Sequence, residues 1–189
     1  MKLVFCPIDL DVSSITQLPA IRNPDSHEWN KYWDNEILLD EPNTWRENLH
    51  EDTESVKKLI MQLPYSELHY VRISIQKGPV LEHKDIRRNH VNPRDWYYTQ
   101  KYEPCGYRII ITGSTDVLEG QVDGEWQKLF LPTVPCCYVS DTSNLRHRVL
   151  DDPNRGIIYV RGIVDPEKHE QLLKKSLERY GDYAVYSKG

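Results

Sequence analysis

The sequence predicts a mainly β fold with flanking helices, formed by residues 1–189 as a single domain. A chain of 189 residues and 22.3 kDa can bury one hydrophobic core without disulfides or a structural zinc ion. After residue 65, apolar and polar residues alternate in several short runs, which is the period of a half-buried strand. Turn-forming residues separate these runs. Consecutive short strands of this kind close into a sandwich or a barrel.

Residues 1–65 are predicted to form a helical and irregular layer beside the β core. Pro, Asn and Trp recur there in irregular runs. A helix is expected to end before Pro64, because four apolar residues share one helical face: Val56, Leu59, Ile60 and Leu63. The apolar run at the start of the chain is short, and no small-residue cleavage site follows it, so no signal peptide is expected.

Residues 66–164 carry the predicted β core, in at least six strands. The expected strands are residues 70–76, 107–112, 128–131, 136–140, 146–150 and 156–164. Turn residues stand between them at positions 77–79, 112–114 and 152–154. Asp123 and Gly124 lie between Val122 and Trp126, which is the pattern of a two-residue hairpin.

A second helix is predicted over residues 165–181. Asp165 can cap it, Pro166 suits its first turn, and Gly181 follows its last apolar residue. Its expected buried face consists of His169, Leu172, Leu173, Leu177 and Tyr180.

Charge and cysteine content restrict the class of protein. The net charge of −5 argues against a general nucleic-acid binder, and no apolar run approaches the roughly 20 residues that cross a bilayer. A cytoplasmic protein is therefore expected. Between Arg72 and Arg108 basic residues outnumber acidic ones, which suits a small anion. The four cysteines show no C-x-x-C spacing, so buried reduced thiols are expected.

His83, Lys84 and Asp85, followed later by His147, form the candidate metal site. The ends of an H-x-D triplet point to the same side of a strand, and a second strand can bring in the distant histidine. Two imidazoles and one carboxylate can hold iron on one face and leave the opposite face open. The predicted catalytic and metal-binding residues are therefore His83, Asp85 and His147. The simpler alternative is a solvated turn with an ion pair to Lys84 or Arg87.

Two further histidines are alternatives to His147. His69 and His90 can also approach the pocket, and a histidine satisfied within a core is common.

Arg155 is the candidate anion-binding residue. It opens the last predicted strand eight residues after His147, where a guanidinium can hold a metal-bound carboxylate through two parallel hydrogen bonds. Arg161 shares its strand face at even spacing and is the main rival. The simpler alternative is that Arg155 pairs with Asp151 or Asp152 on the surface.

This order of residues resembles the double-stranded β-helix oxygenases that use Fe(II) and 2-oxoglutarate. It is most similar to their aspartyl/asparaginyl β-hydroxylase-like branch, over about half of the chain. The segments that carry the resemblance are, in chain order, Ser74, Gly78 with Pro79, His83, Tyr107 to Ile110, Val139 to Ser143 before His147, and Asn154 to Ile158. The resemblance implies a jelly-roll, cupin-like core.

The resemblance also implies an activity and its cofactors. Fe(II), dioxygen and 2-oxoglutarate would be used to hydroxylate an amino-acid or peptidyl side chain, with 2-oxoglutarate converted to succinate. Arg155 would bind the far carboxylate of 2-oxoglutarate, with Arg108 and Ser74 as secondary contacts. Asp85 favours hydroxylation over halogenation, because the related halogenases leave that ligand position to chloride.

The chain departs from the β-hydroxylase at three places. That enzyme has no carboxylate at the position of Asp85, and it has a histidine where this chain has Ile110. The stretch before His147 is one residue longer. These departures leave the superfamily in place and argue against the β-hydroxylase's own peptidyl Asp or Asn substrates.

Two other classes of protein remain open. A cupin-type metalloenzyme would use a similar pocket without Arg155, and a non-catalytic β-sandwich module would not bring the histidines together. Motifs for a zinc hydrolase of the H-E-x-x-H kind, a nucleotide-binding glycine-rich loop and a Gly-x-Ser-x-Gly nucleophile are absent from the sequence. The polar and aromatic segment 87–98 can cover the entrance of the pocket, and the simpler alternative is that its aromatic residues only pack the loop onto the barrel.

Overall fold

A computed structural model describes residues 1–15, 53–76, 78–84, 106–142 and 144–188, and gives the backbone alone for residues 53–54, 67–75, 161 and 163. The described strands are β1 (Lys2–Ile8), β2 (Tyr65–Ile75), β3 (Val80–His83), β4 (Gly106–Thr112), β5 (Leu118–Val122), β6 (Glu125–Lys128), β7 (Cys136–Ser140), β8 (His147–Val149), β9 (Gly156–Val164) and β10 (Val185–Ser187). The described helices are α3 (Thr53–Ile60), α4 (Pro166–Tyr180) and the short 3₁₀ helix η3 (Gly181–Tyr183). The prediction of a mainly β protein with flanking helices is confirmed.

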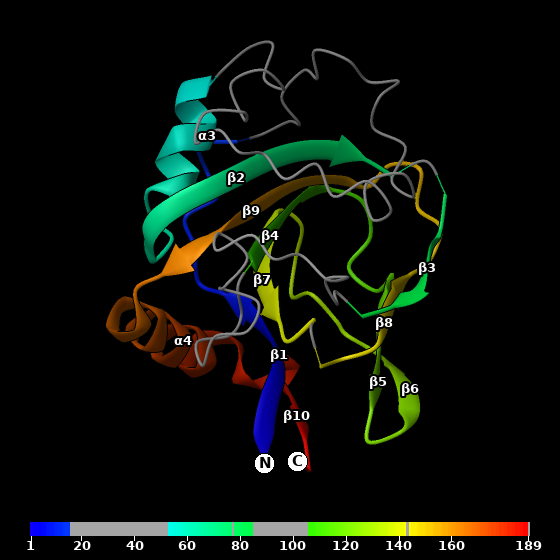
Figure 1. Ribbon diagram of the computed structural model, residues 1–189. Helices are drawn as coiled ribbons and strands as arrows, with labels where there is room; N and C mark the ends of the chain where they lie inside the picture. The colour runs from blue at the N-terminus through cyan, green and yellow to red at the C-terminus, as the bar shows by residue number, and fades with distance from the viewer. Residues whose placement is uncertain (16–52, 77, 85–105, 143, 189) are drawn as a thin grey trace, which may run out of the picture.

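The strands form two antiparallel sheets (Figure 1). The larger sheet has the order β10-β1-β7-β4-β9-β2, and the smaller one has the order β3-β8-β5-β6. From β2 to β9 the strands pair in a nested way: β2 with β9, β3 with β8, β4 with β7, and β5 with β6. The first strand of this series therefore lies beside the last, and the chain passes back and forth between the sheets.

Two hydrophobic layers cover the two faces of the larger sheet. One lies between the sheets and joins Ile110 and Ile157 of the larger sheet to Val80 and Val149 of the smaller. The other lies on the opposite face, where α3 and α4 pack (Figure 1). The four apolar residues predicted for the first helix face belong to this second layer, so that prediction is confirmed. Cys6, Cys136 and Cys137 are buried free thiols, as expected, while Cys105 lies outside the described residues. Burial raises the pKa of Cys136 to about 12.

Strand β1 corrects the prediction that residues 1–65 only flank the sheet. Its residues lie inside the larger sheet, between β10 and β7. Phe5 packs in the layer between the sheets, while Cys6 and Ile8 pack in the layer under the helices. A strand that is buried on both faces is apolar throughout, so it lacks the alternation that marks a half-buried strand.

The hairpin between β5 and β6 forms at the predicted place. Asp123 and Gly124 have φ angles of 52° and 92°, the left-handed conformation that a tight two-residue turn requires. The predicted strand 128–131 was wrong, because β6 ends at Lys128. Leu129 and Leu131 instead hydrogen-bond through their backbone N–H groups to the carbonyls of Leu118 and Thr115.

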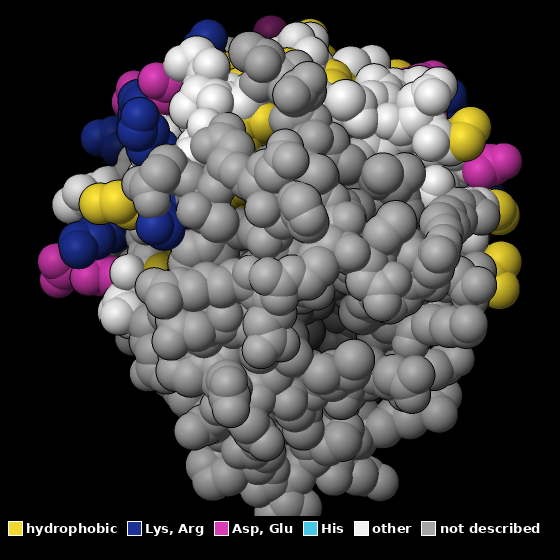
Figure 2. All heavy atoms as spheres, turned by 90° about the horizontal axis from the view of Figure 1, so that it is seen from above, with side chains coloured by type: hydrophobic (Ala, Val, Ile, Leu, Met, Phe, Trp, Pro, Cys, Tyr) yellow, Lys and Arg dark blue, Asp and Glu magenta, His cyan; other side chains and the backbone are white. Residues whose placement is uncertain are grey.

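Helix α4 begins at the predicted cap. The Asp165 carboxylate accepts hydrogen bonds from the backbone N–H groups of Glu167 and Lys168, at 3.0 and 3.1 Å. Gly181 has a φ of −56°, so it ends α4 without a left-handed turn and the chain continues into η3. Basic and acidic side chains are intermingled along the edge of the molecule on which the helices lie (Figure 2). Within the described part of the chain, neither helix has the length and apolar character needed to cross a membrane.

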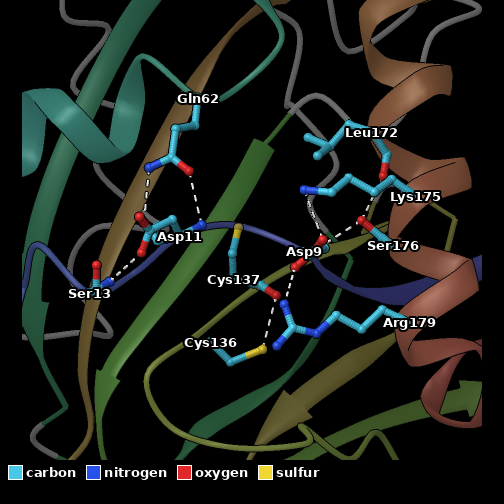
Figure 3. Close-up of polar contacts among 10 residues, drawn as sticks. All are labelled: Asp9, Asp11, Ser13, Gln62, Cys136, Cys137, Leu172, Lys175, Ser176 and Arg179. Atoms are coloured by element: carbon cyan, nitrogen blue, oxygen red, sulfur yellow. Dashed lines mark hydrogen bonds and ion pairs between the residues drawn. The ribbon is translucent and has the colours of Figure 1, made fainter.

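Asp9 connects α4 to the end of β1 (Figure 3). Its carboxylate binds Lys175 at 2.8 Å and also accepts a hydrogen bond from Arg179. Its backbone N–H donates to the Ser176 hydroxyl at 3.0 Å. These contacts tie two turns of the helix to the sheet beneath it.

Replacing Asp9 with asparagine is expected to lower the free energy of unfolding by about 1 kcal/mol at pH 7, because Lys175 and Arg179 are largely exposed and water screens their attraction. Burial raises the pKa of the Asp9 carboxyl group, but hydrogen bonds and charge from Lys175 and Arg179 outweigh it and the net pKa is lowered. The stabilisation is therefore present at neutral pH and lost as the pH falls below about 3.9 toward the folded-state pKa. Denaturant unfolding at pH 7 and pH 3 measures it.

The exposed Glu178→Gln variant of the same helix is the control, and it should change the stability little at either pH. A loss of stability in Asp9→Asn that is equally large at pH 3 would contradict the electrostatic explanation.

Candidate metal and anion site

His83 and His147 lie side by side at the end of β3 and the start of β8. They are direct register partners across the two strands. Their ring centroids are 4.3 Å apart, with an interplanar angle of 55°. Two residues that are 64 positions apart in the sequence are thus brought into contact by one antiparallel pairing.

An irregularity in β3 decides which way His83 faces. His147 lies two residues before the buried Val149, so both point toward the space between the sheets. Val80 pairs with Val149 and is buried with it, but His83 is three residues further on, which in a regular strand is the opposite face. The register shifts between Val80 and His83, and this bulge brings His83 onto the inner face.

The adjacent residues point outward. Glu82 and Arg146 form an ion pair of 3.3 Å between half-exposed side chains. The histidines and this ion pair therefore occupy opposite faces of the smaller sheet.

Both imidazole rings are oriented by a backbone carbonyl two residues earlier. His83 Nδ1 lies 2.7 Å from the carbonyl oxygen of Leu81, and His147 Nδ1 lies 3.0 Å from that of Leu145. A carbonyl oxygen only accepts, so each neutral ring carries its proton on Nδ1 and its lone pair on Nε2. This is the arrangement in which a histidine is held ready to bind a metal through Nε2. The two side chains fit such an ion.

Asp85, the third predicted ligand, lies outside the described residues. Among those that are described, no group of three or more His, Cys, Asp or Glu side chains is placed to hold a metal ion. His90 and Arg87 also lie outside the described residues, and the His69 side chain is not described. The metal-binding triad therefore stays a prediction of which the structure brings two members together.

Among the described residues, Arg155 is one of the largest completely buried side chains, with 1% of its surface exposed. The alternative of a surface ion pair with Asp151 or Asp152 is therefore wrong. Burial lowers the pKa of the Arg155 guanidinium, and the charge of Arg108 lowers it further, while Tyr138 and Asp152 act in the opposite direction. A bound carboxylate would favour the charged form of both arginines.

Hydrogen bonds in the turn before β9 fix the backbone at Arg155, whose side chain lies in the interior. Asp152 accepts hydrogen bonds from the backbone N–H groups of Ser114 and Asn154, at 2.7 and 3.1 Å, and its carbonyl accepts one from the N–H of Arg155. Gly113 has a φ of 112°, and a Cβ there would lie 2.9 Å from the Cα of Arg155. Only glycine permits this close approach without strain.

Arg108 lies on the inner face of β4, between two tyrosines. It is in register with Tyr138 of β7 and Tyr159 of β9, and its guanidinium carbon is 4.6 Å from the centre of the Tyr159 ring and 6.0 Å from that of Tyr138. These distances allow cation–π attraction. A Cβ at Gly106 would lie 2.7 Å from the Tyr159 ring, so the glycine makes room for it.

The remaining predicted anion contacts are known only by backbone position. Ser74 is in register with Ile157, and Arg161 is in register with Gly106 on one side and Tyr70 on the other. Their side chains are not described, so neither is assigned to the site or excluded from it. The predicted entrance segment 87–98 also lies outside the described residues.

Three residues of this interior were not foreseen from the sequence. Tyr138 and Tyr159 surround Arg108, and the buried Gln76 joins the two sheets by donating to the Leu150 carbonyl at 2.7 Å while its N–H binds the Arg155 carbonyl at 2.9 Å. The tyrosines belong to runs recognised as strands, but no local pattern distinguishes a tyrosine beside a cation from one in an apolar core.

Comparison with protein-family models, curated proteins and solved structures finds no match to this chain. Its function is therefore inferred from the side chains of the site, because a fold alone does not define an activity.

Proposed function

We propose that the protein is an Fe(II)- and 2-oxoglutarate-dependent dioxygenase that hydroxylates an amino-acid or peptidyl side chain. The observation that carries the proposal is the pair His83 and His147, with both rings turned so that Nε2 bears the lone pair, on a sheet that faces the buried Arg155. A metal ligand pair and a buried cation within one inter-sheet interior suit a metal-bound dicarboxylate.

The nested strand pairing supports a double-stranded β-helix, or jelly-roll, as the core. In such a fold the first strand lies beside the last and successive strands alternate between two sheets. The pairs β2 with β9, β3 with β8, β4 with β7 and β5 with β6 follow this order. Strands β1 and β10 extend the larger sheet beyond β7.

His83 and His147 would hold the metal ion, with Asp85 as the proposed third ligand. When bound, Fe(II) would supply the activation of dioxygen by which 2-oxoglutarate and a substrate C–H group become succinate, carbon dioxide and a C–OH group. The carbonyls of Leu81 and Leu145 orient the imidazole rings so that Nε2 faces the metal position. The bulge in β3 keeps His83 on the inner face.

Arg155 would bind the far carboxylate of 2-oxoglutarate. A carboxylate buried without a cationic partner is costly. The guanidinium of Arg155 is already desolvated, and the backbone N–H of the same residue is held by the Asp152 carbonyl. Arg108 would add positive potential from the neighbouring strand. Ser74 remains a proposed secondary contact, and Arg161 remains the proposed rival to Arg155.

A metalloenzyme of the cupin type that does not use 2-oxoglutarate is the second candidate. It would use the same two histidines, which also favour it over a non-catalytic β-sandwich module. It would have no need of Arg155, and the burial of this arginine beside the charge of Arg108 favours the 2-oxoglutarate enzyme.

Binding measurements under anaerobic conditions test the proposal without a known substrate. Titration with Mn(II) is expected to give one bound ion per chain, and 2-oxoglutarate is expected to bind the metal-loaded protein at least tenfold more tightly than the metal-free protein. Addition of Fe(II), ascorbate, air and labelled 2-oxoglutarate should then release succinate and carbon dioxide. Failure to retain stoichiometric metal would contradict the proposal, and metal binding with no affinity for 2-oxoglutarate would favour the second candidate.

A further inference from the structure

The turn that joins β7 to β8 is organised around one buried carboxylate. Asp141, with 6% of its surface exposed, follows directly after β7. Its Oδ1 lies 2.9 Å from the Asn144 side-chain amide and 3.3 Å from the Asn144 backbone N–H. Its carbonyl accepts a hydrogen bond of 2.7 Å from the N–H of Leu145. The carboxylate and the carbonyl of Asp141 thus hold Asn144 and Leu145, respectively.

The same turn presents the carbonyl that orients His147. Leu145 is buried in the layer between the sheets, and its carbonyl oxygen lies 3.0 Å from His147 Nδ1. Any change in the direction of the peptide after Leu145 moves this acceptor relative to the ring. Asp141 therefore acts on His147 through Leu145.

Strand β1 anchors the turn from outside. The N–H of Asp141 donates to the Val4 carbonyl at 2.9 Å, and Lys2 Nζ lies 2.5 Å from Asp141 Oδ2. Lys2 is half exposed, so its attraction is screened and the hydrogen bonds to Asn144 carry more of the ordering. Strand β1 is in this way connected to the turn that orients the candidate metal ligand His147.

We propose that Asp141 is a positioning residue that sets the tautomer and ring orientation of His147. The effect on the ring is a property of this chain with or without a metal, while its consequence for metal affinity rests on the proposed function. His83 provides the internal comparison, because its ring is oriented by the Leu81 carbonyl of β3, which makes no contact with the Asp141 turn among the interactions described.

The expected chemical effect follows from the two tautomers of a neutral imidazole. With the Leu145 carbonyl in place the proton is held on Nδ1 and Nε2 keeps its lone pair. Without it, the ring is free to carry the proton on Nε2, which cannot then bind a metal. Loss of a group that orients a metal-binding histidine typically weakens metal affinity by about 10- to 100-fold.

The test compares Asp141→Ala and Asp141→Asn with the wild-type protein and with Asp116→Ala. Asp116 is a half-exposed aspartate paired with Lys128 at 2.7 Å, so Asp116→Ala removes an aspartate–lysine ion pair, as Asp141→Ala does, but leaves the turn before His147 intact. Imidazole nitrogen shifts, measured by NMR on the metal-free protein near pH 8, report the tautomer of each histidine. Mn(II) affinity and the thermal unfolding midpoint are measured on the same samples.

In the wild type and in Asp116→Ala, His147 is expected to carry its proton on Nδ1. In Asp141→Ala the Nε2-protonated tautomer of His147 is expected to become a major form, while His83 keeps its tautomer and Mn(II) affinity falls by at least tenfold. Asp141→Asn keeps an oxygen that accepts from Asn144, so it is expected to retain most of the wild-type His147 signal even if Asp141→Ala fails to fold.

An unchanged His147 tautomer in folded Asp141→Ala would overturn the inference. If Asp141→Ala does not fold, an Asp141→Asn protein whose two histidines change tautomer to the same extent would overturn it as well, because the residue would then support the fold as a whole. A wild-type protein that binds no Mn(II) would refute the proposed function, and the NMR comparison would still decide the role of Asp141.

Discussion

His83→Ala is expected to reduce Mn(II) affinity by at least 100-fold and to bring succinate release from 2-oxoglutarate to the background level. The substitution removes one of two imidazoles whose centroids are 4.3 Å apart, and no described side chain is placed to replace it. A 100-fold loss corresponds to about 2.7 kcal/mol of binding free energy. Isothermal titration with Mn(II) and labelled 2-oxoglutarate turnover measure the two effects.

The fold of the His83→Ala protein should survive. The side chain is only partly buried, and the substitution removes one hydrogen bond to the Leu81 carbonyl, which contributes about 1 kcal/mol. Glu82→Gln is the matched control, because the neighbouring side chain lies on the outer face and pairs with the exposed Arg146. Metal affinity and turnover in His83→Ala that equal those of Glu82→Gln would refute the metal site.

Arg155→Met is expected to weaken 2-oxoglutarate binding without a comparable loss in the free energy of unfolding. Removal of the guanidinium should weaken 2-oxoglutarate binding to the metal-loaded protein by at least 100-fold, since the buried carboxylate would lose its cationic partner. The free energy of unfolding should change much less than the binding free energy, because removal of the charge avoids its desolvation cost while the contact of the guanidinium with Tyr138 is lost, and these two effects oppose each other. Titration calorimetry and denaturant unfolding measure these two quantities.

Arg148→Met is the control for Arg155→Met. Arg148 pairs with Glu119 at 2.5 Å and lies over the Trp126 ring on the outer face of the smaller sheet. Its loss should cost a little stability and leave 2-oxoglutarate binding unchanged. If Arg155→Met instead keeps its affinity for 2-oxoglutarate and loses several kcal/mol of stability, Arg155 supports the fold and the rival Arg161 becomes the candidate anion ligand.

Much of the fold could be predicted because interactions between residues that are close together in the sequence determine it. The cap at Asp165, the apolar face of α3 and the turn at Asp123 and Gly124 each depend on residues within a few positions of one another. Strand β9 covers the predicted run 156–164 for the same reason, since β-branched isoleucine and valine residues make up more than half of it.

Other elements were missed because their pattern reflects distant partners. Strand β1 is apolar on both faces since helices cover one side and the smaller sheet covers the other. Strand β10 has only three residues, and its pairing with β1 joins the two ends of the chain. The extra strand residues predicted after Lys128 are apolar because Leu129 and Leu131 enter the core between the sheets, which a turn can do as well as a strand.

For the candidate site, the residue types and their order could be read from the sequence: two histidines, an aspartate and an arginine, each near the end or the start of a predicted strand. The inward direction of His83 could not be read from the sequence, because it depends on a bulge in β3 that overrides the alternation implied by the spacing from Val80. Only the tertiary structure placed Arg155 in the interior rather than on the surface. Burial and register depend on which strands become neighbours, and that is a property of the whole chain and not of any short segment.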